Sequence, residues 1–87
     1  MYPFITLEDQ TEIVHSDILP DNKLIIYVEK PMADECFRHA VLRIPEYQWE
    51  QVKGFTKEEL NKYQEIVRRI ESNLYENAKS KRKKMIH

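Results

Sequence analysis

The chain has 87 residues, of which 41% are hydrophobic and 33% charged, and its formal net charge is −1 at pH 7. This length suits a single domain, and the apolar content is sufficient for a core, which argues against wholesale disorder. The single cysteine excludes an intrachain disulfide, and the single glycine excludes glycine-rich phosphate-binding loops. No apolar run approaches the roughly 20 residues that span a bilayer, and no basic residue precedes the apolar N-terminal stretch, so we expect a cytoplasmic protein without a membrane partner.

The first half of the chain predicts antiparallel strands. Residues 4–7 and 11–15 are β-prone and flank a polar turn, which favours a hairpin. Pro20-Asp21-Asn22 is a turn signature, since proline presets φ and asparagine tolerates the left-handed region. Because glycine is so scarce, we expect turns with positive φ to use Asn, Asp or longer connections. Residues 23–30 form the strongest predicted strand, with apolar side chains on both faces, as in a central strand.

A further strand is predicted at residues 36–44, between Pro31 and Pro45. Residues 46–53 fit either a strand, through the alternation of Tyr47 and Trp49, or one helical turn, through Trp49 and Val52. We expect an irregular or single-turn connection there that packs Trp49 against the sheet. The predicted sheet is therefore a small antiparallel meander of three or four strands.

One long helix is predicted at residues 57–79. Thr56 and Glu59 fit a capping box, and Phe55 before the cap can pack on Leu60. The apolar residues that follow recur every three or four positions and form one stripe: Leu60, Tyr63, Ile66, Val67, Ile70, Leu74 and Ala78. The sequence thus predicts an α+β domain at residues 1–79, with the helix packed on the sheet, and a basic, frayed tail at 80–87.

The sequence carries no catalytic or metal-binding pattern, so we expect a protein that is not an enzyme and has no cofactor and no small-molecule substrate. Cys36 and His39 have a C-x-x-H spacing, but on one strand they face opposite sides. No serine lies in a nucleophile-elbow context. We interpret Cys36 as a small core residue, and His15 and His39 as residues of the sheet surface.

One helix covers only one face of a sheet, so the second face is a candidate interface. Its expected contacts are Ile25, Tyr27, Phe37 and Val41. An apolar patch of that kind indicates self-association or binding to another protein. The alternative is that residues 47–52 fold over this face. Within the interaction class, an acidic surface also suits an inhibitor or regulator from a mobile element, since it can occupy a site that otherwise holds nucleic acid.

The basic C-terminal end is the alternative functional site. Residues 1–67 hold 7 Lys and Arg against 13 Asp and Glu, whereas residues 68–87 hold 7 against 2. Basic residues at this end could neutralise phosphates without reading sequence. The candidates are Arg68, Arg69, Lys79, Lys81, Arg82, Lys83 and Lys84. The competing interpretation is a solubility element that also complements the helix dipole.

Two segments resemble a group of small uncharacterised bacterial α+β proteins of the Firmicutes and mobile-element type. They are residues 5–16, ITLEDQTEIVHS, and residues 54–60, GFTKEEL. Both segments are structural, a hairpin and a helix start. The resemblance implies no activity, ligand or site residue.

Overall fold

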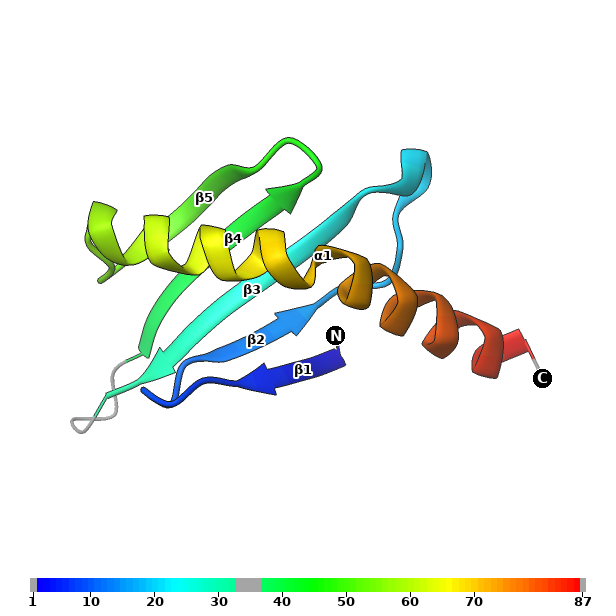
Figure 1. Ribbon diagram of the computed structural model, residues 1–87, viewed down its shortest axis with the longest axis horizontal. Coiled ribbons are helices and arrows are strands. Elements are labelled where there is room, and N and C mark those ends of the chain that lie inside the picture. The colour runs from blue at the N-terminus through cyan, green and yellow to red at the C-terminus, as the bar shows by residue number, and fades with distance from the viewer. Residues whose placement is uncertain (1, 33–36, 87) are drawn as a thin grey trace.

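The computed structural model describes residues 2–32 and 37–86, with side chains up to Ser80 except that of Phe37. Five strands, β1 (Tyr2–Thr6), β2 (Glu12–His15), β3 (Leu24–Pro31), β4 (Phe37–Ile44) and β5 (Gln48–Lys53), form one antiparallel sheet in the order β1-β2-β3-β4-β5. A short 3₁₀ helix, η1 (Pro20–Asn22), lies between β2 and β3, and α1 (Lys57–Ile86) follows β5. The α+β meander is confirmed, with five strands in place of the expected three or four (Figure 1).

The additional strand is β5, which replaces the irregular connection expected over residues 46–53. It pairs with β4 through a register shift between His39 and Val41. Gln51, in β5, has a φ of 51°. A bulge adds a residue to one strand and interrupts the alternation of faces. The sequence therefore lacks a regular period of two at this strand. Trp49 packs against the core, but it does so as a member of the sheet and not from a connection outside it.

Positive φ angles occur at more residue types than expected. Asp21 and Asn22 adopt them in η1, in line with the expectation for Asn and Asp. Gln10 (φ 69°) and Tyr47 (φ 58°) also adopt them, at the β1–β2 and β4–β5 turns. The first of these turns is closed by a backbone hydrogen bond from Leu7 N to Thr11 O at 2.8 Å. Long-range contacts of the side chains around these turns must offset the local cost of this conformation.

The helix α1 covers one face of the sheet and runs obliquely across its strands (Figure 1). The capping box is confirmed, because Thr56 N donates to Glu59 Oε1 at 2.9 Å and Glu59 N donates to Thr56 Oγ1 at 3.2 Å. The hydrogen bond to Thr56 N is the main cause that lowers the pKa of Glu59. Phe55 before the cap is buried and meets the ring of Tyr63 edge-on at 5.3 Å.

The core lies between this helix and the sheet. The helix contributes the predicted stripe, of which four members are buried: Tyr63, Val67, Leu74 and Ala78. The sheet contributes alternate residues of its central strands: Ile13, Leu24, Ile26, Val28, Ala40, Leu42 and Ile44. Burial of apolar surface on this scale is the main term that stabilises a domain of this size.

The helix is longer than expected, since α1 continues to Ile86 and not to residue 79. Its C-terminal end lies beyond the end of β2 in Figure 1. No helix in the described part of the chain has the apolar length that a bilayer crossing needs. Cys36, which was expected to be a small core residue, lies outside the described residues.

Candidate interaction surface

The face of the sheet opposite α1 carries side chains in rows that cross the strands, and we call it the open face. The register of the ladders defines a middle row, whose members are Pro3, Val14, Tyr27, Val41 and Glu50. On one side of it lies a charged row, whose members are Thr6, Glu12, Glu29, His39 and Lys53. On the other side lies a third row, formed by Ile25, Arg43 and Gln48. No helix or strand of the described residues packs on this face.

The centre of the open face is apolar and only partly exposed. Tyr27 and Ile25 are half-buried, whereas Val14 and Val41 are 9% and 6% exposed. The two valines are buried, and the accessible apolar surface at this centre comes from the partly buried Tyr27 and Ile25. The segment at residues 47–52 does not fold over this face, because β5 extends the same sheet.

Ion pairs flank this centre. Glu29 Oε2 lies 3.6 Å from His39 Nδ1 in the charged row, and Glu50 Oε1 lies 3.0 Å from Arg43 Nε at the other side. Glu12 on β2 and Lys53 on β5, the outermost charged members of this row, are both exposed. The charged row therefore runs from acidic side chains on β2 and β3 to basic or titratable ones on β4 and β5.

Three of the four predicted interface residues lie on this face. Ile25, Tyr27 and Val41 share it, and the side chain of Phe37 lies outside the described part of the chain. Sequence analysis missed Val14, which the period-two pattern of residues 11–15 could have placed there. It also missed the charge gradient from Glu12 to Lys53, because that gradient depends on the pairing of β4 with β5.

Both edges of the sheet are protected against pairing with another strand. The β1 edge carries Pro3 and a register shift between Pro3 and Ile5. The β5 edge carries the second register shift and the charged residues Glu50 and Lys53. Proline, bulges and charges are the usual means of blocking edge-to-edge association. Contacts with another protein therefore have a freer approach to the open face than to either edge.

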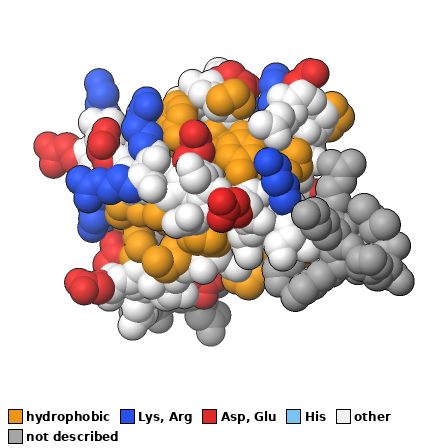
Figure 2. Space-filling view, turned by 45° about the vertical axis from the view of Figure 1, so that its right-hand side comes forward, with side chains coloured by type: hydrophobic (Ala, Val, Ile, Leu, Met, Phe, Trp, Pro, Cys, Tyr) orange, Lys and Arg blue, Asp and Glu red, His pale blue; other side chains and the backbone are white. Residues whose placement is uncertain are grey.

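The basic candidates on α1 do not form one surface in the described side chains. The guanidinium carbon of Arg68 lies 4.1 Å from the centroid of the Tyr47 ring, and the Tyr47 hydroxyl donates to Glu71. Arg69 and Lys79 are exposed. Lys81, Arg82, Lys83 and Lys84 lie on the helical end of α1, with side chains outside the described set. On the side seen in Figure 2, basic and acidic side chains are interspersed.

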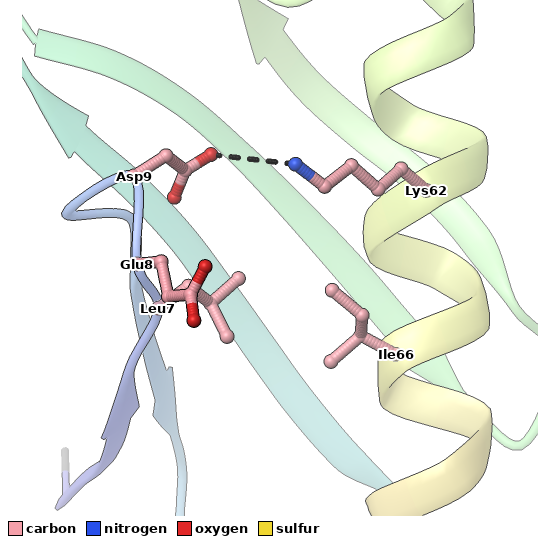
Figure 3. A pocket seen from close by; sticks show the side chains of 5 residues that line it. All are labelled: Leu7, Glu8, Asp9, Lys62 and Ile66. Atoms are coloured by element: carbon pink, nitrogen blue, oxygen red, sulfur yellow. Dashed lines mark ion pairs between the residues drawn. The ribbon is translucent and has the colours of Figure 1, made fainter.

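An open hollow of about 310 Å³ lies between the β1–β2 turn and α1, lined by Leu7, Glu8, Asp9, Lys62 and Ile66 (Figure 3). The carboxylate of Asp9 spans its polar side and is already engaged. It accepts hydrogen bonds from Thr11 N at 3.0 Å and from the Tyr63 hydroxyl at 2.9 Å, and it lies 3.7 Å from Lys62 Nζ.

Burial raises the pKa of Asp9, but the hydrogen bonds from Thr11 and Tyr63 outweigh this effect and bring the pKa down to about 2. At neutral pH the side chain is therefore an ionised acceptor with no proton to donate and little basicity. Its bonds tie the β1–β2 turn to the helix, which is a structural role.

His15, expected at the sheet surface, is fully buried. It pairs with Ile26 on the helix-facing side of the sheet. Its Nδ1 donates to the carbonyl of Ser16 at 2.9 Å, so Nε2 carries no hydrogen and accepts from Asn77 Nδ2 at 2.7 Å. The rings of Tyr2 and Phe4 lie 5.5 and 6.3 Å away. The imidazole thus joins β2 to the last buried turn of α1, and the expectation of a surface position was wrong because sequence spacing cannot show what α1 covers.

Within the described ranges, no group of three or more His, Cys, Asp or Glu side chains lies close enough to hold a metal ion. No protein-family model, curated protein sequence or solved structure matches this chain.

Proposed function

We propose that this protein is a non-enzymatic interaction module that binds protein through the open face. The single observation that carries this proposal is the partition of the sheet, with α1 on one face and the half-buried side chains of Tyr27 and Ile25 at the centre of the other. Aromatic side chains at the centre of a patch with a polar rim are typical of binding hot spots. Such a module suits an adaptor, or an inhibitor or regulator of another protein.

The other surfaces of the molecule support this assignment indirectly. Both sheet edges are blocked, as described above, and the outward side of α1 is polar, with exposed Asn61, Glu65, Arg69 and Asn73. In the hollow beside the β1–β2 turn, the carboxylate of Asp9 is engaged by internal hydrogen bonds from Thr11 and Tyr63. Ile5 on β1 and Val52 on β5 are exposed singly on the two edge strands, whereas Tyr27 and Ile25 lie together at the centre of the open face.

Site-specific crosslinking tests the proposal. A photoreactive p-benzoylphenylalanine replaces Tyr27, and a matched control carries it at Asn73, which is exposed on the outward side of α1. We expect a discrete protein adduct in cells from position 27 and none from position 73. The adduct should disappear when Ile25→Asp is added, because a charge at the patch centre loses its hydration on binding. Equal crosslinking from both positions would contradict the proposal.

A second candidate function is nucleic-acid binding through the end of α1. The observation in its favour is that α1 stays helical to Ile86 and ends beyond the sheet, which places its basic residues on one regular element. Replacement of Lys81, Arg82, Lys83 and Lys84 by Gln should then abolish binding to DNA or RNA oligonucleotides in fluorescence anisotropy. Binding by the unaltered chain should also fall steeply with salt. Salt-sensitive binding that survives the four substitutions would exclude this end of the helix.

A further inference from the structure

The rows on the open face are self-complementary when two copies of the chain stack face to face. From the register, Glu12 and Glu29 occupy the β2 and β3 positions of the charged row, and His39 and Lys53 occupy the β4 and β5 positions. A two-fold axis parallel to the strands, between β3 and β4, lays β2 of one copy over β5 of the other. The same axis brings each charged row onto its symmetry mate in reverse order.

We propose that the occupant of the open face is a second copy of this chain, related by that two-fold axis. Glu12 of one copy then faces Lys53 of the other, and Glu29 faces His39. Both contacts occur twice in the dimer, as in any isologous interface. The inference rests on the proposed function, since it specifies the partner for the same surface.

The same arrangement brings one apolar pair together at the axis, while Ile25 faces Arg43 and Val14 faces Glu50 of the other copy. The axis passes between Tyr27 on β3 and Val41 on β4, so each Tyr27 faces the valine of the other copy. The Arg43–Glu50 ion pair, at 3.0 Å, is neutralised within each copy and lies toward the rim. An axis across the strands would instead place the charged row over the third row, with His39 facing Arg43. Charge complementarity therefore selects the axis along the strands.

The area of the face fits a weak dimer. Strands lie about 4.8 Å apart and rise about 3.3 Å per residue. The axis superposes the strands β2 to β5, which have 4, 8, 8 and 6 residues, and these strands give a face of roughly 400 Å². Two copies would bury roughly 800 Å² in total, below standard specific interfaces and in the range of weak, transient contacts. Face-to-face sheets pack about 10 Å apart and near −30°, a separation that long charged side chains at the rim can cross.

Two single charge reversals test the register. Each of E12K and K53E creates two like-charge contacts in its own homodimer. A mixture of the two variants restores two opposite-charge contacts in the heterodimer. Within one copy, Glu12 on β2 and Lys53 on β5 are separated by two intervening strands. Mixing therefore cannot rescue any effect that arises inside a single chain.

Sedimentation velocity on the full chain over a range of concentrations, at low and moderate salt, measures the association. We expect the unaltered chain to form a dimer, each reversal to weaken it about tenfold, and the mixture to recover most of the affinity. Matched controls are E65K and K79E, which reverse exposed charges on α1 and should leave the dimer unchanged. Urea unfolding checks that every variant is folded.

Three outcomes would overturn the inference. They are a chain that stays monomeric at millimolar concentration, a mixture no stronger than the separate variants, and a dimer that is insensitive to both reversals. A monomeric chain that still crosslinks to a different protein from position 27 would refute the homodimer alone. Absence of both the dimer and the crosslink would refute the proposed function as well.

Discussion

Tyr63→Phe tests whether the β1–β2 turn is fastened to α1 by the Tyr63 hydroxyl. Tyr63 is 1% exposed, and its hydroxyl donates to Asp9 Oδ2 at 2.9 Å. The same oxygen lies 3.1 Å from Oγ1 of the fully buried Thr11, so it accepts the threonine proton. Burial is the main cause that raises the pKa of Tyr63, which keeps the phenol protonated and able to donate. Phenylalanine removes both bonds and keeps the ring in the core.

The expected loss follows from these two bonds. A hydrogen bond to a charged acceptor contributes about 1.5–3 kcal/mol, and a buried neutral one contributes about 1 kcal/mol. The carboxylate of Asp9 is 27% exposed, so water can replace part of its lost partner. We therefore expect Tyr63→Phe to lower the free energy of unfolding by about 2–3 kcal/mol.

Tyr75→Phe provides a matched control, because it also removes one hydroxyl from α1. The Tyr75 hydroxyl donates to the carbonyl of Asn22 at 2.9 Å in an exposed contact. Water can satisfy that carbonyl, so the control should cost about 0.5 kcal/mol or less. Urea unfolding followed by circular dichroism gives both values. If Tyr63→Phe costs no more than Tyr75→Phe, the hydroxyl does not fasten the turn.

The same prediction has a pH dependence whose sign follows from Asp9. Its folded pKa, about 2, lies below the ordinary value of 3.8. The carboxylate therefore stabilises the fold above about pH 4, and this contribution is lost as the pH falls through 2. The linkage has an upper bound of about 2 kcal/mol, which solvent screening reduces to about 1–2 kcal/mol at this partly exposed side chain. The difference between the unaltered chain and Tyr63→Phe should consequently shrink from pH 7 to pH 2, and a constant difference would refute this linkage.

Two further substitutions test contacts that sequence reasoning did not anticipate. Asn77→Leu removes the donor to the buried Nε2 of His15 and should lower the free energy of unfolding in urea by about 1–3 kcal/mol. Asn73→Leu, on the exposed side of α1, should be nearly neutral. Equal costs would show that the imidazole needs no donor. Gln10→Gly relieves the strain of a φ of 69° and should raise the free energy of unfolding by about 0.5–1 kcal/mol, and with it the melting temperature. Gln48→Gly, in the strand β5, should lower the melting temperature. A loss of stability at both positions would mean that the turn favours glutamine for another reason.

Local patterns in the sequence predicted the parts of the fold that depend on neighbouring residues. Three features were predicted correctly, because each follows from a helical or strand period within a few residues. They are the capping box at Thr56 and Glu59, the helical stripe from Tyr63 to Ala78, and the strand β3. The strand β5 was one of two interpretations of residues 46–53, and the irregular connection preferred there was wrong. Its bulge and the positive φ of Gln51 break the period of two, and its pairing with β4 is what defines it.

The tertiary structure alone decided which side chains meet. Asp9 and Tyr63 are 54 positions apart, and His15 and Asn77 are 62 apart, so no local period connects them. Burial of His15 depends on where α1 crosses the sheet. The alternation in β3 placed Ile25 and Tyr27 on one face by itself. The charge gradient from Glu12 to Lys53 exists only because four strands pair in register and bring residues from distant parts of the chain into one row.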